Sequence, residues 1–167
     1  DNAHNQAQLI SINNATTGSI TFTDNTIPLK GSVTDVGAAL AGVTGYAGVV
    51  EITDNASDIS ATAVIDIANA MSGSKPVILN KPNITGNAFH VVQALTKITN
   101  TGNANVKLNN PHTLAELMQI NNNTSGSITL NSLNMKLEGT SVQLSQALDG
   151  IAYKGEITFT DSAGTKV

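Results

Sequence analysis

A thirteen-residue stretch occurs twice in this 167-residue chain. Residues Leu9–Thr21 read LISINNATTGSIT, and residues Leu117–Thr129, which lie 108 positions later, read LMQINNNTSGSIT. An ungapped comparison of Leu9–Ser32 with Leu117–Thr140 gives 11 identical positions in 24. Structural repeats are usually about 20–50 residues long, so a longer period contains several smaller units. The recurrence therefore predicts an architecture of stacked repeat units.

The match extends well beyond this stretch, at an offset of 108 that becomes 107 after one deleted turn residue. We therefore predict one repeat domain over residues 1–167, with a long-period internal repeat that relates residues 1–59 to 109–167. The matched pairs are Leu29/Leu137, Gly31/Gly139, Ala39/Ala147, Leu40/Leu148, Gly42/Gly150, Tyr46/Tyr153, Gly48/Gly155 and Asp54/Asp161.

Apolar residues recur at steps of three and four in several short segments, which is the pattern of an amphipathic helix with one narrow buried stripe. Asn110–Pro111 and Thr113 with Glu116 are competing start signals for one helix, while Ser57–Asp58 and Asn87 are candidate caps of two others. Leu9–Ile12 is expected to end a first helix. The stripes are Val33/Val36/Leu40/Val43, Val64/Ile67/Ala68/Met71, Ala88/Val91/Val92/Leu95/Ile98, Leu114/Leu117/Met118 and Leu144/Ala147/Leu148/Ile151.

Short segments between these helices alternate apolar residues with Thr, Lys or Glu, which predicts strands with one buried face. A second short strand is expected after some of them, at Ile27–Lys30, Met135–Glu138 and Asn83–Thr85. The main predicted strands are Ile20–Thr23, Val49–Thr53, Val77–Leu79, Val106–Leu108, Ile128–Leu130 and Ile157–Thr160.

The unit is therefore a helix, a turn and a strand, and about six such units fit the chain. Successive β-α-β connections are right-handed, which makes the main strands parallel. Two architectures bury both apolar faces of each unit. One is an α/β solenoid with a mostly parallel sheet on one wall and short helices on the other; the other is a closed α/β domain. The recurrence after 108 residues favours the solenoid.

Composition excludes several partners and favours one environment. Charged residues make up 12% of the chain, the net charge is −4, and Arg is absent, which argues against nucleic acid and against a polybasic membrane-surface patch. No apolar run reaches the length of a membrane span. The absence of Cys and the abundance of Thr and Asn fit a secreted bacterial surface protein. The chain begins at Asp1 inside a repeat, which predicts a piece of something longer.

Two segments resemble phrases found in repeat modules of very large bacterial extracellular proteins. Val50–Ile59 resembles a strand followed by Thr-Asp-x-Ala-x-x-Ile, and Met135–Leu148 is similar to Leu-x-x-(Ser/Thr)-Val followed by Gln-Ala-Leu. The resemblance implies a structural or adhesive role in an adhesin-like, S-layer-like or giant cell-surface protein, with no catalytic set. The chain departs from the calcium-binding repeats of secreted proteins, because it lacks Gly-Gly-x-Gly-x-Asp.

Asp24, Asp54 and Asp161 follow Thr in similar contexts, at the ends of predicted strands or close to them. They are candidate calcium ligands, since Ca²⁺ takes six to eight oxygen ligands; the alternative is an Asx-turn or a helix cap, in which the carboxylate accepts a backbone N–H bond. Calcium is the only cofactor that the sequence suggests, and the turn chemistry is favoured. No His pair has the spacing of metal ligands.

Four threonines form Thr-x-Thr pairs: Thr21 with Thr23, and Thr158 with Thr160. On a flat solenoid wall they would form a binding surface for a glycan, a cell surface or ice; the alternative is that Thr is simply a good exposed strand residue. Other recurrent residues are predicted to be structural joints between units, although the tyrosines could also stack on a sugar. The joints are Gly18, Gly126, Gly48, Gly155, Tyr46 and Tyr153.

These observations predict a non-enzymatic structural module, since no nucleophile elbow, phosphate-binding loop or dinucleotide fingerprint is present. Its expected partners are neighbouring repeats or subunits that stack end to end, in a tandem array or in a filament. A surface-binding module is the second hypothesis. Both place the chain outside the cell or on its surface.

Overall fold

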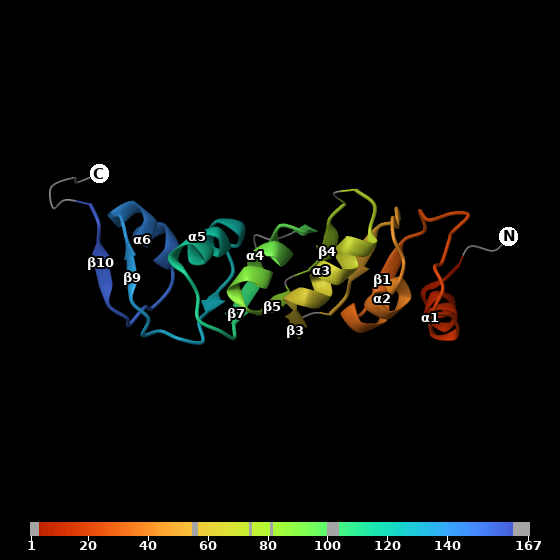
Figure 1. The fold of residues 1–167 in the computed structure, drawn as a ribbon, viewed down its shortest axis with the longest axis horizontal. Coiled ribbons are helices and arrows are strands. Elements are labelled where there is room, and N and C mark those ends of the chain that lie inside the picture. The colour runs from red at the N-terminus through yellow and green to blue at the C-terminus, as the bar shows by residue number, and fades with distance from the viewer. Residues whose placement is uncertain (1–3, 55–56, 74, 81, 100–103, 162–167) are drawn as a thin grey trace.

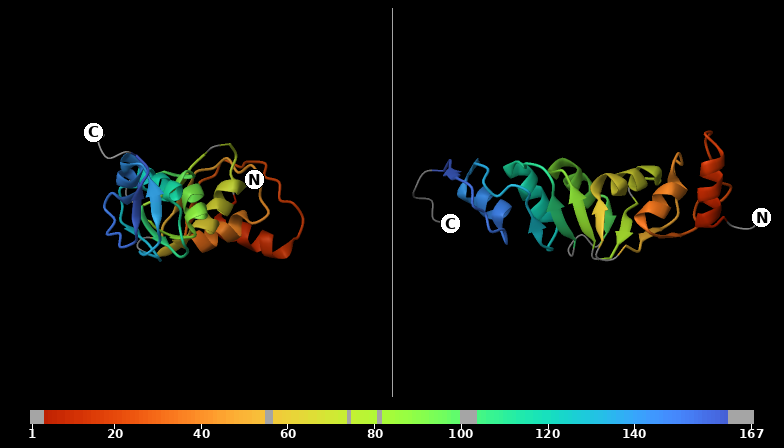
Figure 2. Two further views of the ribbon diagram at one scale, coloured as in Figure 1. Left: turned by 60° about the vertical axis from the view of Figure 1, so that its left-hand side comes forward. Right: turned by 90° about the horizontal axis from the view of Figure 1, so that it is seen from below.

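The structure is a computed structural model and describes residues 4–54, 57–73, 75–80, 82–99 and 104–161. Its elements follow one another in chain order along the long axis, with α1 (Gln6–Ala15) at one end and α6 (Ser141–Leu148) and β10 (Ile157–Phe159) at the other (Figure 1). Two further views show the same elongated arrangement (Figure 2). Helices and parallel strands follow each other along it, which confirms the predicted α/β class.

The described residues form six helices, and each helix packs on the next one in the sequence. The apolar stripes become their buried faces: in α2 the stripe consists of Val36, Ala39 and Leu40, and in α6 it contains Leu144 and Ala147. The predicted first helix is longer than expected, because Leu9–Ile12 lies within α1. The remaining helices are α2 (Val33–Leu40), α3 (Ala61–Ala70), α4 (Ala88–Leu95) and α5 (Leu114–Asn123).

Local capping explains where these helices begin. A reciprocal capping box opens α5, in which Thr113 and Glu116 bond to each other's backbone N–H, so Thr113 rather than Asn110 caps this helix. Asn87 caps α4 as predicted and accepts a 2.7 Å bond from the N–H of His90. The prediction that Ser57–Asp58 caps α3 is wrong, because α3 begins after Ser60 and Asp58 belongs to a strand.

All strand pairings in the described part of the chain are parallel, as predicted, but the strands form three sheets rather than one. Two sheets have four strands, in the orders β1-β2-β4-β6 and β3-β5-β7-β8, and the third pairs β9 with β10. The strands are β1 (Leu29–Gly31), β2 (Val50–Ile52), β3 (Asp58–Ser60), β4 (Val77–Leu79), β5 (Asn83–Gly86), β6 (Ile98–Thr99), β7 (Asn105–Leu108), β8 (Ile128–Thr129), β9 (Leu137–Gly139) and β10.

The two sequence copies have the same local geometry. Leu29 pairs with Val50 in β1-α2-β2, and the equivalent Leu137 pairs with Ile157 in β9-α6-β10. Both helices are followed by a glycine with positive φ, at Gly42 (67°) and Gly150 (70°), where a residue with a Cβ would be strained. The resulting core is almost wholly aliphatic, since among the described residues Tyr46 is its only fully buried aromatic side chain.

Several strand predictions need correction. Ile20–Thr23 is not a strand, although the equivalent Ile128–Thr129 forms β8. The reason is that β8 pairs with β7, whereas no described strand lies beside residues 20–23, and an isolated strand does not persist. The strands predicted at Ile27–Lys30 and Met135–Glu138 begin two residues later, as β1 and β9. Two strands, β3 and β6, were not predicted, and β6 takes Ile98 from the expected stripe of α4.

Candidate functional site

The three candidate calcium ligands do not come together in one site among the described residues, and each accepts hydrogen bonds. Asp54 accepts a bond from the N–H of Val33, the first residue of α2. Asp161 accepts bonds from the N–H and the hydroxyl of Ser141, the first residue of α6, at 2.9 and 2.5 Å. Asp24 accepts from the N–H and hydroxyl of Thr26 at 2.9 and 2.6 Å, which is an Asx-turn.

These bonds also explain the acidity of two of the aspartates. The side-chain bond from Thr26, followed by its backbone bond, lowers the pKa of Asp24, and the side-chain bond from Ser141 does the same to the pKa of Asp161. In the described part of the chain, no three His, Cys, Asp or Glu residues come together in a way that could hold a metal ion. The geometry of these aspartates therefore matches turn and cap chemistry.

We call each helix together with the strands beside it a layer. Asp54 and Asp161 form hydrogen bonds that join consecutive layers. In each case a polar side chain that follows a strand caps the helix of the preceding layer. Asn110 has the same role, since its side-chain oxygen accepts a 3.0 Å bond from the N–H of Ala88 at the start of α4. Sequence analysis had considered Asn110 only as a cap of its own helix.

The recurrent tyrosines and glycines occupy equivalent joints. The Tyr153 hydroxyl donates a 2.7 Å bond to the carbonyl of Met135, and the Tyr46 hydroxyl donates to the carbonyl of Ile27. Two residues after each tyrosine, a glycine lies against the same carbonyl: a Cβ on Gly155 would be 2.0 Å from the oxygen of Met135, and one on Gly48 would be 2.1 Å from that of Ile27. Burial raises the pKa of both tyrosines.

A threonine version of this joint occurs in the repeated thirteen-residue stretch. The Thr124 hydroxyl donates to the carbonyl of Ala104, and a Cβ on Gly126 would lie 2.1 Å from the same oxygen. In the first copy, the hydroxyl of Thr16 still accepts a 3.0 Å bond from the N–H of Gly18, but the nearest atom to a Cβ on Gly18 is that hydroxyl oxygen, at 3.4 Å. The signal that sequence reasoning missed is therefore hydroxyl-x-Gly, which occurs as Tyr-x-Gly and Thr-x-Gly.

The four candidate binding threonines are not brought together. Thr21 and Thr23 lie in an irregular segment near α1, whereas Thr158 lies in β10 and Thr160 follows it at the opposite end of the molecule (Figure 1). Because the two Thr-x-Thr pairs are at opposite ends, they do not form one wall.

The histidines of the two copies pack on the recurrent tyrosines. The ring centroids of His4 and Tyr46 are 6.3 Å apart, and those of His112 and Tyr153 are 6.2 Å apart. His112 is only 2% exposed. Burial lowers the pKa of His112, against the opposing effect of the Glu116 carboxylate.

We expect the protein to lose stability as the pH falls below the ordinary value of an unfolded histidine, about 6.5, towards the lowered folded pKa of His112. In that window the unfolded chain binds the proton more tightly than the folded one, so acidification favours unfolding. Urea unfolding from pH 7.5 to 5 measures this. The His112→Leu variant should lose much of the dependence, whereas the carboxylates with lowered pKa, Asp24 and Asp161, act only near pH 4 and below. An unchanged pH profile in the variant would contradict the assignment.

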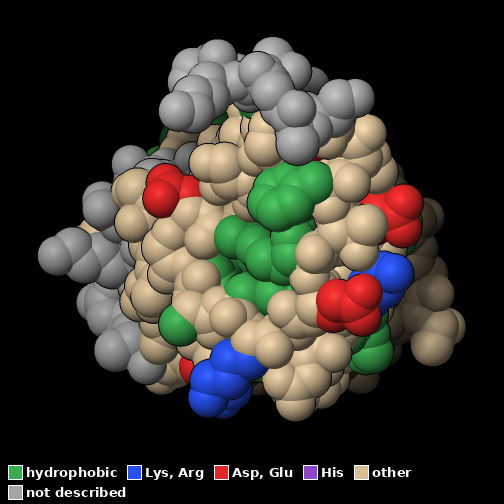
Figure 3. All heavy atoms as spheres, turned by 90° about the vertical axis from the view of Figure 1, so that its left-hand side faces the viewer, with side chains coloured by type: hydrophobic (Ala, Val, Ile, Leu, Met, Phe, Trp, Pro, Cys, Tyr) green, Lys and Arg blue, Asp and Glu red, His purple; other side chains and the backbone are tan. Residues whose placement is uncertain are grey.

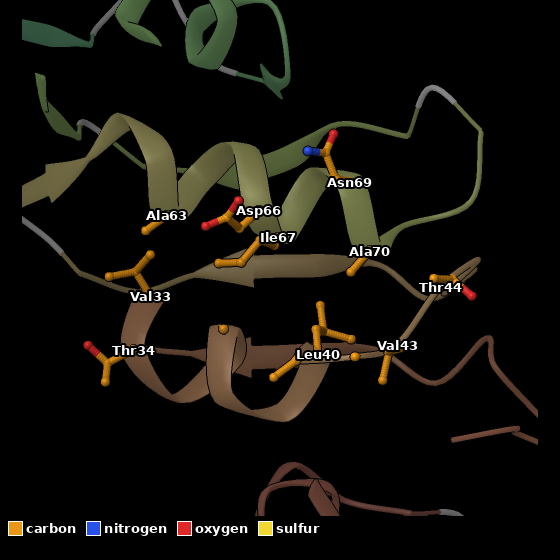
Figure 4. Close-up of a pocket in the computed structure, with 13 residues that line it drawn as sticks. Val33, Thr34, Leu40, Val43, Thr44, Ala63, Asp66, Ile67, Asn69 and Ala70 are labelled. Carbon is orange, nitrogen blue, oxygen red and sulfur yellow. The ribbon is translucent and has the colours of Figure 1, made fainter. Parts of the chain in front are cut away.

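A groove runs between α2 and α3, and small and apolar side chains line most of it (Figure 4). Leu40 and Val43 lie on the α2 side, with Ile67 and Ala70 on the α3 side, and among the described residues that line the groove only Asp66 is charged. A groove with one carboxylate and no partner acid or base offers no pair for general acid–base chemistry. The groove instead shows how the helices of two consecutive layers pack against each other.

The end of the molecule at α6 and β10 carries half of the same groove. Its lining includes Ser141, Ser145, Leu148, Asp149 and Gly150. These five residues are the repeat equivalents of Val33, Gly37, Leu40, Ala41 and Gly42, which form the α2 side of the internal groove. Inside the molecule α3 supplies the other side, and no described element supplies it at this end.

Side chains at this end are more exposed than their repeat equivalents inside the molecule. Val50 and Ile52 of β2 are 0% and 1% exposed, but their equivalents Ile157 and Phe159 of β10 are 39% and 61% exposed. The apolar side chains of this end form one patch, with acidic and basic side chains around it (Figure 3). We call this surface the C-terminal face and define it by Leu144, Leu148, Ile157 and Phe159.

No protein-family model, curated protein or solved structure matches this chain. Among the described residues, no helix is long and apolar enough to cross a membrane.

Proposed function

We propose that this chain is a non-enzymatic structural module of a bacterial extracellular or cell-surface repeat protein, and that its layers form an α/β solenoid. It assembles by end-to-end stacking, in which one layer covers the exposed face of the next. The observation that carries the proposal is the C-terminal face, the uncovered equivalent of a surface that α3 covers inside the chain. The composition, rich in Thr and Asn, low in charge and without Cys, supports the extracellular setting.

Three features support stacking. The layers are joined by hydroxyl-x-Gly contacts and by caps that one layer provides to another, both of which act between neighbours. Among the described residues, β10 pairs only with β9, so in this part of the chain its other edge is open to an incoming strand. Apolar patches that remain exposed in soluble proteins commonly mark interaction sites. The alternative, a surface for a glycan, a cell surface or ice, would need the four threonines on one wall, but they lie at opposite ends of the molecule.

Purified chains should associate through their ends as concentration rises, and electron microscopy should show short rods one chain wide. Phe159→Asp should reduce association by placing a charge on the C-terminal face. Phe89→Asp is the matched control, because Phe89 is 58% exposed but lies on the central helix α4. Sedimentation of the three proteins measures the effect. Association that both variants weaken equally, or chains that stay monomeric at the highest soluble concentration, would contradict end-to-end stacking.

A further inference from the structure

Stacking through the C-terminal face does not specify which layer covers it. The internal repeat answers this question, since β9-α6-β10 is equivalent to β1-α2-β2 in sequence, strand register and helix capping. Inside the chain, α2 packs on α1 on one side and on α3 on the other. The helix α6 already packs on α5, the equivalent of α1. Its open side therefore corresponds to the side of α2 that α3 covers.

We propose that the C-terminal face binds a repeat layer with the chemistry of residues 58–79, carried by a neighbouring repeat module. Such a layer has a helix like α3, which presents Ala63, Ile67 and Ala70 to the groove, followed by a strand like β4 with an apolar-x-apolar sequence. This inference rests on the proposed function and names the partner of its assembly surface.

The free edge of β10 specifies the register of the incoming strand. Thr160 donates to the carbonyl of Gly139, and Leu137 donates to the carbonyl of Glu156, so the even-numbered residues of β10 face β9. Alternate residues of a strand direct their N–H and C=O groups to opposite neighbours, so Ile157 and Phe159 face the open edge. In β2, the pairs Glu51–Ile78 and Ile52–Leu79 join the equivalent edge to β4. We expect Thr158 and Phe159 to take the same parallel pairing.

The face itself matches an apolar partner. Leu40 is 3% exposed in the internal groove because α3 covers it, whereas its equivalent Leu148 is only partly buried. Ser141 and Ser145, which replace Val33 and Gly37, are small enough to allow close approach of a helix rich in alanine. Among the residues that line this end groove, Asp149 is the only charged one.

A second copy of this chain is a poorer match for the C-terminal face than a layer of the α3 type, so identical chains should stack only weakly and at high concentration. The layer that it would bring first is that of α1, and α1 is equivalent to α5. Inside the chain α5 packs on α4 and α6, so the outer side of α1 corresponds to a surface that α4 covers. Ile12 of α1 is accordingly 46% exposed, whereas its equivalent Ile120 is 0% exposed. The four-layer period thus leaves two layers, like those of α3 and α4, between the end of one copy and the beginning of the next.

Two chains of equal length test the proposal. In the first, a copy of residues 61–110 follows Val167, the repeat equivalent of Ser60, so that the new layers are of the α3 and α4 types. In the second, a copy of residues 5–54 follows Val167 and offers the layers that another chain would bring. Amide hydrogen exchange of Ile157 and Phe159, measured by NMR, reports whether the edge of β10 is covered.

The first extension should slow the exchange of these two amides roughly a hundredfold, towards the rates of Val50 and Ile52, and the second should slow it by less than about tenfold. Placing Asp at the appended copy of Ile67 should restore fast exchange. Protection by the second extension alone, or equal protection by both, would overturn the proposed partner and leave stacking intact. If neither extension protects β10, whether or not the added residues fold, the proposed partner is wrong. If the unmodified chains also do not associate, the proposed function is wrong as well.

Discussion

Replacing Gly126 by alanine should lower the free energy of unfolding by about 3 kcal/mol, whereas the same change at Gly18 should alter it by less than about 0.5 kcal/mol. The two glycines occupy the same place in the two sequence copies. A Cβ on Gly126 would lie 2.1 Å from the backbone oxygen of Ala104, which cannot rotate away. A Cβ on Gly18 would have only the hydroxyl oxygen of Thr16 within 4 Å, at 3.4 Å.

Urea unfolding followed by far-ultraviolet circular dichroism measures both changes. Gly37→Ala is a useful control, because Gly37 lies inside α2 and a Cβ placed on it would meet no atom within 4 Å beyond its chain neighbours and the backbone of its own helix. That variant should gain about 0.5–1 kcal/mol, since alanine favours a helix more than glycine does. Equal losses at Gly126 and Gly18 would mean that the turn itself requires glycine, and the contact between layers would not be the cause.

The helices could be predicted from the sequence because their signals are local. The stripes in α2 and α6 and the capping box of Thr113 and Glu116 lie within one or two turns of chain. Asn110 shows the limit of this reasoning. Its side chain is a good helix cap by composition, but it caps the helix that begins 22 residues earlier, at Ala88. Whether a polar residue serves its own helix or a neighbouring one depends on how the layers stack.

The strands were harder to predict because they depend on neighbours distant in sequence. The segments Ile20–Thr23 and Ile128–Leu130 have similar sequences, yet only the second forms a strand, because β7 lies beside it. The strands β3 and β6 were missed because Asp58 was assigned to a helix cap and Ile98 to the apolar stripe of a helix. The number of sheets depends on which strand edges meet, and the period of a single strand carries no information about that.

In the candidate site, too, local features could be predicted and contacts between distant segments could not. The Gly and Tyr positions could be identified as joints because they recur, but the carbonyls that they contact, in Ile27 and Met135, could not. The threonine wall required residues 21 and 158 to share a face, and local strand signals do not determine which layers are neighbours. The sequence predicted end-to-end stacking but not the surface on which it would take place. Its residues emerge from comparing β10 and α6 with β2 and α2.

That comparison leads to the second large effect. Ile52→Ala should destabilise the protein by about 3 kcal/mol, because Ile52 is 1% exposed and its truncation leaves a cavity between β2 and the layer of α3. Phe159→Ala changes the equivalent position and removes a larger side chain, yet it should cost less than about 0.5 kcal/mol, because Phe159 is 61% exposed. The same urea unfolding measures both values.

Comparing these two variants shows whether the stability effect depends on the side chain itself or on the layer that covers it. If Phe159 is the contact for a covering layer, its ring becomes buried once a layer of the α3 type follows Val167. The loss of unfolding free energy in Phe159→Ala should then rise towards that in Ile52→Ala. An unchanged cost in the extended chain would show that the added layer does not reach Phe159. A large cost already in the unextended chain would show that Phe159 supports α6 from outside, and its exposure would then be no sign of a missing partner.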